Sequence, residues 1–283
     1  MLSPKLYAQS MLQRAGLLYR LKASVLQELY WRVAGRHWIL ARQKQLDFYR
    51  RLLPRLRRGD LIFDIGANVG FKTDLFLRLG ARVIAIEPDE TNQSILKERF
   101  VRLRLVQRPV TIVGKAVSDK SALETMWIDG PGSAVNTLSK KWATALKGNK
   151  SRQTYGHYGL DFTNQKTVES TTLEQLIGEY GTPIFIKIDV EGYELHVIRG
   201  LQRPVAHLSF EVNLPEFRSE GLQCVEILAS LSSAGRFNYA VDCEQGLALE
   251  RWLSAGEFLQ VLGQCTDSAI EVFWKGFAGE DET

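Results

Sequence analysis

Short apolar runs, bounded by glycine, proline or acidic residues, alternate with stretches of helical periodicity along most of the chain. Such runs are typical of buried strands in a parallel sheet, and the periodic stretches of amphipathic helices. Regular alternation of the two predicts an α/β fold, a mostly parallel seven-stranded sheet with helices on both faces. The predicted strands lie at residues 61–65, 82–87, 110–117, 184–189, 207–212, 237–241 and 270–274.

The first predicted strand runs directly into a glycine turn and then a helix. Phe71, Leu75 and Leu79 recur at helical spacing and predict one apolar face. Gly80 follows, where the C-terminus of a helix favours a left-handed residue. This order places backbone N–H groups and the positive end of a helix at the carboxyl edge of the sheet, where ligands bind in open α/β folds.

The spacing of polar residues in this turn indicates which ligand it binds. The motif reads D-x-G-x-N-x-G, and Asn68 and Phe71 stand where a dinucleotide-binding fingerprint has its second and third glycines. The carboxylate of Asp64, at the end of the strand, repels a pyrophosphate but accepts hydrogen bonds from an ammonium group or from water. We therefore expect a cationic nucleoside without phosphate, S-adenosylmethionine, with Asp64 beside its methionine end.

Further contacts to this cofactor are expected in the turn and at the end of the second strand. Gly66 and Gly70 allow the backbone to approach the cofactor closely, and Asn68 adds a polar contact. Glu87 and Pro88 follow about 20 residues after the turn, a distance at which an acidic residue reaches ribose hydroxyls. We therefore assign Glu87 to the ribose.

The third predicted strand ends at Ser118 and Asp119. Because it should end at the same sheet edge, we assign these residues to cofactor binding, with Asp119 on the adenine amino group. The alternative is an ordinary turn, since serine and aspartate favour turns.

Helix starts are marked by capping residues. Asp89 is a plausible N-cap for the helix after the second strand. Thr171 and Thr172 both fit a capping box, with Glu174 and Gln175 three residues after each. These signals place helices after residues 89 and 172.

Acidic residues crowd the end of the fourth strand. Asp189, Glu191 and Glu194 lie within six residues and follow Lys187, and Glu211 interrupts an apolar run in the fifth strand. Crowded carboxylates raise one another's pKa and are typical of reaction sites. We assign Asp189, Glu191, Glu211 and Lys187 to catalysis and Glu194 to substrate binding. A divalent cation on these oxygens is an alternative, but no motif demands it, so a metal-free site is favoured; a structural alternative pairs Glu211 with Lys187 or an arginine.

Residues 129–166 are rich in glycine, lysine and aromatic side chains. Two short extra strands, at residues 126–128 and 166–170, are predicted to pair beside them. A loop of this length is uncommon in a compact domain and is usually functional or disordered. We expect a substrate-side insert, with His157 and Tyr158 near the acceptor and His157 as a candidate general base. The alternative is a mobile loop with a solvated His157.

Together these motifs resemble the FkbM-type family of S-adenosylmethionine-dependent methyltransferases, over roughly residues 60–215. The K-I-D-V-E-G-x-E run is the specific part, whereas many methyltransferase families share the glycine turn. The resemblance implies a class I methyltransferase, Rossmann-like fold and, usually, O-methylation of a hydroxyl on a sugar, glycolipid or secondary metabolite. The family has aspartate where this chain has Glu174, a departure at a helix start. The motifs are Asp64–Gly70, Glu87–Pro88, Ala116–Asp119, Thr172–Leu173, Lys187–Glu194 and Phe210–Glu211.

Charge divides the chain into two parts, a basic helical N-terminal extension at residues 1–58 and a methyltransferase domain at residues 59–283. Residues 1–60 hold 13 Lys or Arg and 3 Asp or Glu, a balance of +10, so the remainder of the +4 chain carries −6. A basic amphipathic helix can cap the core, lie on an anionic membrane or follow a nucleic acid. We favour the cap, then peripheral contact with a membrane or a lipid-linked substrate, and we disfavour nucleic acid.

Three scattered cysteines, Cys224, Cys243 and Cys265, indicate neither a disulfide framework nor a zinc site. No run of about 18 apolar residues predicts a membrane span, and the N-terminus lacks the pattern of a signal peptide. We therefore expect a cytoplasmic protein, with membrane association left open. Its expected partner is a small-molecule, glycan or lipid-linked acceptor, and a homodimer is compatible with the sequence.

Two functions of other classes are the alternatives. An NAD(P)-dependent oxidoreductase uses a similar sheet, but the missing glycines argue against it. A non-catalytic adaptor would bind membrane or nucleic acid through the basic helices, and the acids at four predicted strand ends argue against that.

Overall fold

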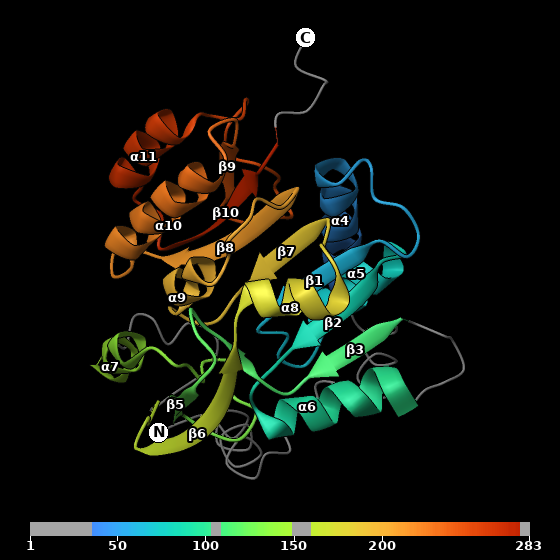
Figure 1. Ribbon diagram of the computed structural model, residues 1–283, viewed down its shortest axis with the longest axis vertical. Coiled ribbons are helices and arrows are strands. Elements are labelled where there is room, and N and C mark those ends of the chain that lie inside the picture. The colour runs from blue at the N-terminus through green and yellow to red at the C-terminus, as the bar shows by residue number, and fades with distance from the viewer. Residues whose placement is uncertain (1–35, 103–108, 149–159, 278–283) are drawn as a thin grey trace.

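A seven-stranded sheet runs through the centre of the molecule in the order β3-β2-β1-β7-β8-β10-β9 (Figure 1). Neighbouring strands from β3 to β8 are parallel, and β10 is antiparallel to β8 and β9. This topology confirms the predicted class I methyltransferase fold. The computed structural model describes residues 36–102, 109–148 and 160–277. The strands of this sheet are β1 (Leu61–Ile65), β2 (Arg82–Ile86), β3 (Val110–Val113), β7 (Phe185–Ile188), β8 (His207–Asn213), β9 (Arg236–Ala240) and β10 (Ala269–Lys275).

Helices cover both faces of the sheet. Alternate strand residues face opposite sides: Ile62 and Phe185 join the apolar cluster of α4 and α5, whereas Phe63 and Ile186 join that of α8 to α11. The chain leaves β1 toward β2 on one side and returns to β7 on the other, which opens a crevice at the carboxyl ends of β1 and β7. The helices are α4 (Arg36–Leu52), α5 (Phe71–Arg78), α6 (Glu90–Leu96), the π-helix η1 (Lys97–Arg102), α7 (Lys140–Gly148), α8 (Leu173–Tyr180), α9 (Glu194–Arg199), α10 (Arg218–Leu231) and α11 (Ala255–Gln264).

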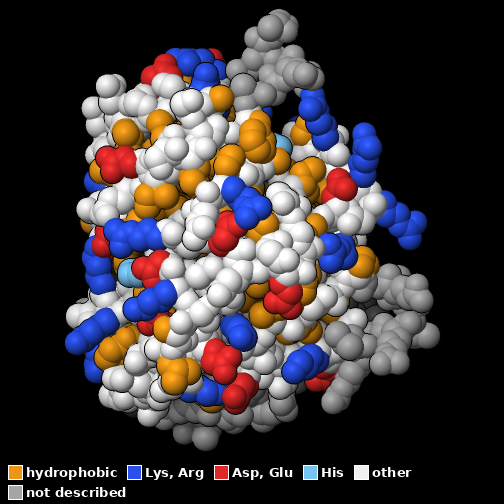
Figure 2. All heavy atoms as spheres, in the orientation of Figure 1, with side chains coloured by type: hydrophobic (Ala, Val, Ile, Leu, Met, Phe, Trp, Pro, Cys, Tyr) orange, Lys and Arg blue, Asp and Glu red, His pale blue; other side chains and the backbone are white. Residues whose placement is uncertain are grey.

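The described part of the N-terminal extension packs onto the sheet as α4. Tyr49 is fully buried and meets the rings of Phe76 and Phe185 edge-on, with centroids 5.2 and 5.8 Å away. Ile39 and Leu40 were expected on the same apolar stripe but are exposed, because only the second half of the helix reaches the sheet-side cluster. On the face in Figure 2, Lys and Arg side chains are dispersed among acidic and apolar ones. No described helix is long and apolar enough to cross a membrane.

A second, three-stranded sheet has the order β4-β6-β5, with β4 at Ala116–Val117, β5 at Leu123–Ile128 and β6 at Asn164–Thr171. The predicted pairing of residues 126–128 with 166–170 is confirmed, and it is antiparallel. The third predicted strand, 110–117, was wrong at its end. The main-sheet strand β3 stops at Val113, and Ala116 and Val117 pair with Ser170 and Thr171, because Ala116 packs with the apolar side chains of the small sheet.

The 129–166 insert is not one long loop, because it contains α7. Trp142, Ala143 and Leu146 form the buried stripe of this helix, and Ser139 Oγ accepts a hydrogen bond of 3.1 Å from the Trp142 N–H at its start. Serine followed by this apolar spacing is a helix signal that the sequence offered. His157 and Tyr158 lie outside the described residues.

The start of α5 also differs from prediction. Phe71 was expected on the apolar face with Leu75, but it is 57% exposed, and the Arg99 guanidinium lies 5.2 Å from its ring centre. As the first residue of the helix it lies outside the contact that Leu75 makes with the sheet. Gly80 has a φ of 95°, which confirms the left-handed residue expected there.

Thr172 is the cap of α8. Its hydroxyl accepts a 3.1 Å hydrogen bond from the Gln175 N–H, and Gln175 Oε1 accepts one of 3.3 Å from the Thr172 N–H. Thr171 instead ends β6 and donates to Gln175 Oε1 at 2.9 Å. One of the two predicted boxes is therefore formed.

Thr172→Ala should lower the free energy of unfolding by about 1 kcal/mol, because the Gln175 N–H loses its acceptor. Thr171→Val is the matched control, since it removes the neighbouring hydroxyl without touching the cap and should cost less. Urea unfolding followed by circular dichroism measures both. A larger loss in the Thr171 variant would contradict the assignment of the cap.

Candidate functional site

The glycine turn after β1 is packed against the end of β7. Gly66 has a φ of 78°, and a Cβ there would lie 1.9 Å from the carbonyl oxygen of Asp189. Gly70 has a φ of 85°, and a Cβ there would meet the Phe100 ring at 2.4 Å. Both positions therefore require glycine to let elements of the protein approach one another.

Glu87 fastens the end of β2 to this turn. Its two carboxyl oxygens accept 2.8 Å hydrogen bonds from the backbone N–H groups of Asn68 and Asp89. Burial raises the pKa of Glu87 to about 7, although these N–H donors oppose the shift. Glu87 is thus held rigidly at the carboxyl edge of the sheet.

A cavity enclosing about 550 Å³ opens at this edge, between the ends of β1, β2 and β7 and the small sheet. It brings together the predicted residues Gly66, Asn68, Glu87 and Pro88 on the glycine-turn side with Asp189 and Glu191 on the β7 side. The lining residues are Ile65, Gly66, Asn68, Ile86, Glu87, Pro88, Asn92, Lys115, Ala116, Val117, Met126, Ser133, Ala134, Asn136, Thr137, Leu138, Asp189, Val190, Glu191 and Tyr193.

Residues 133–138 of the insert cover this cavity and are tied to α6 through Asp89. Asp89 Oδ1 accepts from the N–H groups of Thr91 and Asn92, at 2.8 and 3.2 Å, and so caps α6 as predicted. Its Oδ2 accepts from the Gly132 N–H at 3.3 Å and from Asn136 Nδ2 at 3.0 Å. One carboxylate therefore holds both the helix and the covering loop.

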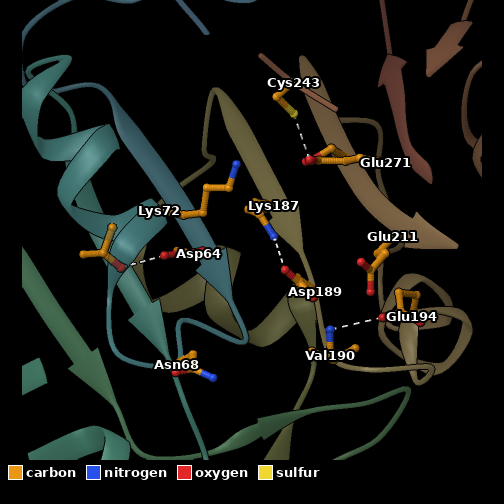
Figure 3. Close-up of polar contacts among 12 residues, drawn as sticks. Asp64, Asn68, Lys72, Lys187, Asp189, Val190, Glu194, Glu211, Cys243 and Glu271 are labelled. Atoms are coloured by element: carbon orange, nitrogen blue, oxygen red, sulfur yellow. Dashed lines mark hydrogen bonds and ion pairs between the residues drawn. The ribbon is translucent and has the colours of Figure 1, made fainter. Parts of the chain in front are cut away.

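Asp64 does not line this cavity. It is buried on the α5 side of the sheet, where the Thr73 hydroxyl donates to Asp64 Oδ2 at 2.6 Å (Figure 3). Burial raises the pKa of Asp64, and the nearby Lys187 ammonium opposes the shift. The side chain joins β1 to α5, so any contact with a ligand at the edge would be indirect.

Ser118 and Asp119 do not line it either. They follow β4 of the small sheet, so the reason for assigning Asp119, a shared edge of the main sheet, was wrong. Ser118 Oγ lies 3.4 Å from the Tyr193 hydroxyl, and Tyr193 lines the cavity and stacks on His196 with ring centres 4.0 Å apart. These residues thus reach the cavity only through Tyr193.

Asp189, Glu191 and Glu211 form a carboxylate cluster, in which one oxygen of each lies within 4.8 Å of the others. Lys187 Nζ donates to Asp189 Oδ2 at 2.7 Å (Figure 3). Burial and the charge of Asp189 raise the pKa of Glu191 to about 8, and hold that of Glu211 well above its usual range. Three carboxylates with this geometry offer the oxygen ligands that Mg²⁺ or Ca²⁺ takes, and equally a base for an acceptor proton.

Glu211 has no ion pair among the described residues, so the structural alternative for it was wrong. Its Oε2 accepts from Asn213 Nδ2 at 2.9 Å, and Glu211 faces Glu271 in the β8–β10 register. Asp189 takes the Lys187 ammonium instead.

Glu194 closes a turn and lies outside the main cavity. Its Oε1 accepts from the N–H groups of Val190 and Gly192, at 3.1 and 3.2 Å. Burial and Glu211 raise the pKa of Glu194 to about 8. It holds the backbone that carries Asp189 and Glu191 in place.

Two contacts to Glu191 were not found from the sequence. Trp142 Nε1 donates to Glu191 Oε2 at 2.9 Å, and Thr137 Oγ1 donates to the Glu191 carbonyl at 2.7 Å. Both come from the insert, almost 50 residues earlier in the chain. Only the helical pattern around Trp142 hinted at an ordered role.

Comparison with known proteins identifies the family. Residues 64–239 match the family described as the methyltransferase FkbM domain. A curated relative, the hexuronic acid methyltransferase AglP of Haloferax volcanii, is 25% identical over 166 residues, 59% of this chain and 60% of its own length. The chain thus spans less than two thirds of that relative.

Two solved structures are similar to it. A methyltransferase FkbM from Methylobacillus flagellatus has a TM-score of 0.47 and 15% identity, over 81% of this chain and 47% of that one. A precorrin-6y C5,15-methyltransferase from Geobacter metallireducens has a TM-score of 0.41 and 11% identity, over 84% and 86%. The family match covers more than half of the chain, and the protein therefore belongs to the FkbM methyltransferase family.

Proposed function

We propose that the protein transfers the methyl group of S-adenosylmethionine to a hydroxyl oxygen of a sugar, free or within a glycolipid or secondary metabolite. Family membership supports methyl transfer from this donor. The observation that carries the proposal is the cavity, which has Glu87 at the end of β2 and Asp189 with Glu191 at the end of β7.

The chemistry of the lining fits the donor. Glu87 offers a carboxylate to ribose hydroxyls, and Ile86, Val117 and Met126 offer apolar surface to an adenine ring. Asn92 Oδ1 is buried in the structure without a hydrogen-bond partner and belongs to a lining residue. A buried acceptor of this kind is stabilised by a ligand donor, such as a ribose hydroxyl.

The acidic end of the cavity suits a cation. Asp189 and Glu191 can accept from the ammonium group of the donor, and when bound the donor supplies a methyl group on a positively charged sulfur. Lys187 holds Asp189 in one position through their 2.7 Å hydrogen bond. Asp189 then accepts the proton of the acceptor hydroxyl as the carbon–oxygen bond forms.

A sugar is the preferred acceptor for two reasons. The printed name of the curated relative gives it a hexuronic acid as substrate. Carboxylates such as those at the β7 end are also suited to hydrogen bonds from sugar hydroxyls.

Glu87→Ala should weaken binding of S-adenosylhomocysteine by about tenfold to 100-fold, because hydrogen bonds to a charged group contribute roughly 1.5–3 kcal/mol. Calorimetric titration measures the dissociation constant. Glu90→Gln is the control, since Glu90 lies three residues away but is exposed and paired with Lys166. Wild-type affinity in the Glu87 variant would count against this placement of the cofactor.

Stability should fall as the pH rises from about 5 to 8. Glu194, with a pKa raised to about 8, binds a proton more tightly in the folded protein, so deprotonation in this window favours unfolding. Glu194→Gln stays neutral and should reduce the fall by about 3 kcal/mol. Urea unfolding at pH 5 and pH 8 measures it, with the exposed Glu98→Gln as control. Equal falls in the wild type and the Glu194 variant would refute the shift.

Methyl transfer is tested with isotopically labelled donor and a panel of neutral and acidic glycans. The expected product carries a new O-methyl group, located by NMR, and Asp189→Asn should slow its formation about 100-fold to 10,000-fold. Binding of S-adenosylhomocysteine together with a methylated nitrogen or carbon would contradict O-methylation and leave the cofactor site standing.

A further inference from the structure

A second cavity lies on the other side of Asp189. Measured in the same way as the first, it encloses about 610 Å³. It is bordered by α4, the start of α5, and the strands β7 to β10. The lining residues are Gln45, Lys72, Lys187, Asp189, Glu211, Ala240, Val241, Asp242, Cys243, Ala269, Ile270 and Glu271.

The carboxylate cluster is the boundary between the two cavities. Asp189 lines both, Glu191 lines the first, and Glu211 lines the second. A group can pass between two bound molecules only where their reacting atoms come within contact distance. Asp189 marks a place where ligands of the two cavities would meet.

Lys72 gives the second cavity a cation without an acidic partner. Its ammonium donates to Gln45 Oε1 at 3.2 Å and lies 5.3 Å from the centre of the Tyr49 ring. Within the described parts of the chain no carboxylate lies at ion-pair distance from it. Figure 3 shows the side chain extending from α5 toward Lys187, on the strand that also leads to Asp189. Lys187 differs, because it is buried and bonded to Asp189.

The acids of this cavity are largely engaged. Glu271 accepts from Ser209 Oγ at 2.7 Å and from Cys243 Sγ at 3.2 Å. Asp189 has the Lys187 ammonium, and burial holds the pKa of Glu211 well above its usual range, so Glu211 is uncharged near neutral pH. Lys72 is therefore the charged group of the cavity that a ligand anion can pair with.

We propose that the second cavity binds the methyl acceptor and that Lys72 determines specificity there by binding a carboxylate of an acidic sugar. This inference rests on the proposed methyl transfer and names the class of its acceptor. It also exchanges the expected roles of two segments. The N-terminal helix α4 forms part of the acceptor site through Gln45, and the described part of the insert covers the donor cavity.

The test is sugar binding to the full-length protein saturated with S-adenosylhomocysteine. Saturation-transfer NMR titrations give the affinities for D-glucuronate and D-glucose. We expect wild type to bind glucuronate at least about tenfold more tightly than glucose, and Lys72→Met to lose about tenfold in glucuronate affinity, because a charge-assisted hydrogen bond is lost. Lys72→Arg should retain most of the affinity. Lys44→Met is the matched control, since it removes an exposed charge next to Gln45 outside the cavity.

Calorimetry with S-adenosylhomocysteine separates the two proposals. Its affinity should be the same in all four proteins, because Lys72 does not line the donor cavity. Failure of the wild type to bind it would overturn the proposed function. Normal binding with equal affinity for both sugars, with no affinity for either up to about 50 mM, or with an unchanged Lys72→Met variant, would overturn the acceptor assignment alone.

Discussion

One buried ammonium group makes the acidic edge of the sheet physically tenable. Lys187 is 4% exposed, and burial alone would lower its pKa, but Asp189, Glu271 and Asp64 raise it. Removing one partner of a buried ion pair costs about 3–5 kcal/mol, because the other charge stays without compensation. The side chain comes from the centre of the sheet, beside β1 and β8. From there a single cation balances acids on three strands, and the carboxylates needed for chemistry can stand close together.

The fold was predictable wherever the signal was local. Strands read from short apolar runs, Asp89 read as a cap, and the turn from Gly66 to Gly70 were all confirmed, because burial alternation and capping depend on neighbours in the sequence. The placement of Glu87 at the cavity follows from the same logic. Its position at the end of β2 is fixed by the strand before it, so the edge it occupies needed no knowledge of distant contacts.

What the sequence missed depends on contacts between distant segments. Asp64 ends β1 just as Glu87 ends β2, yet it faces α5, because one residue along a strand changes the face of the sheet. Ala116 left the main sheet for a partner some 50 residues later. The hydrogen bond from Trp142 to Glu191 likewise joins segments that no local pattern relates. The second cavity is assembled from both ends of the chain, and no single motif contains it.

The division of labour within the Asp89 carboxylate has a consequence for how the donor cavity could be opened. One oxygen serves the first turn of α6, and the other serves Gly132 and Asn136. Rupture of the second set leaves the first intact, so the cover can detach while the helix keeps its cap. The hinge and the scaffold meet in one side chain but do not share bonds, and a ligand can be exchanged beneath the cover without loosening the wall that recognises it.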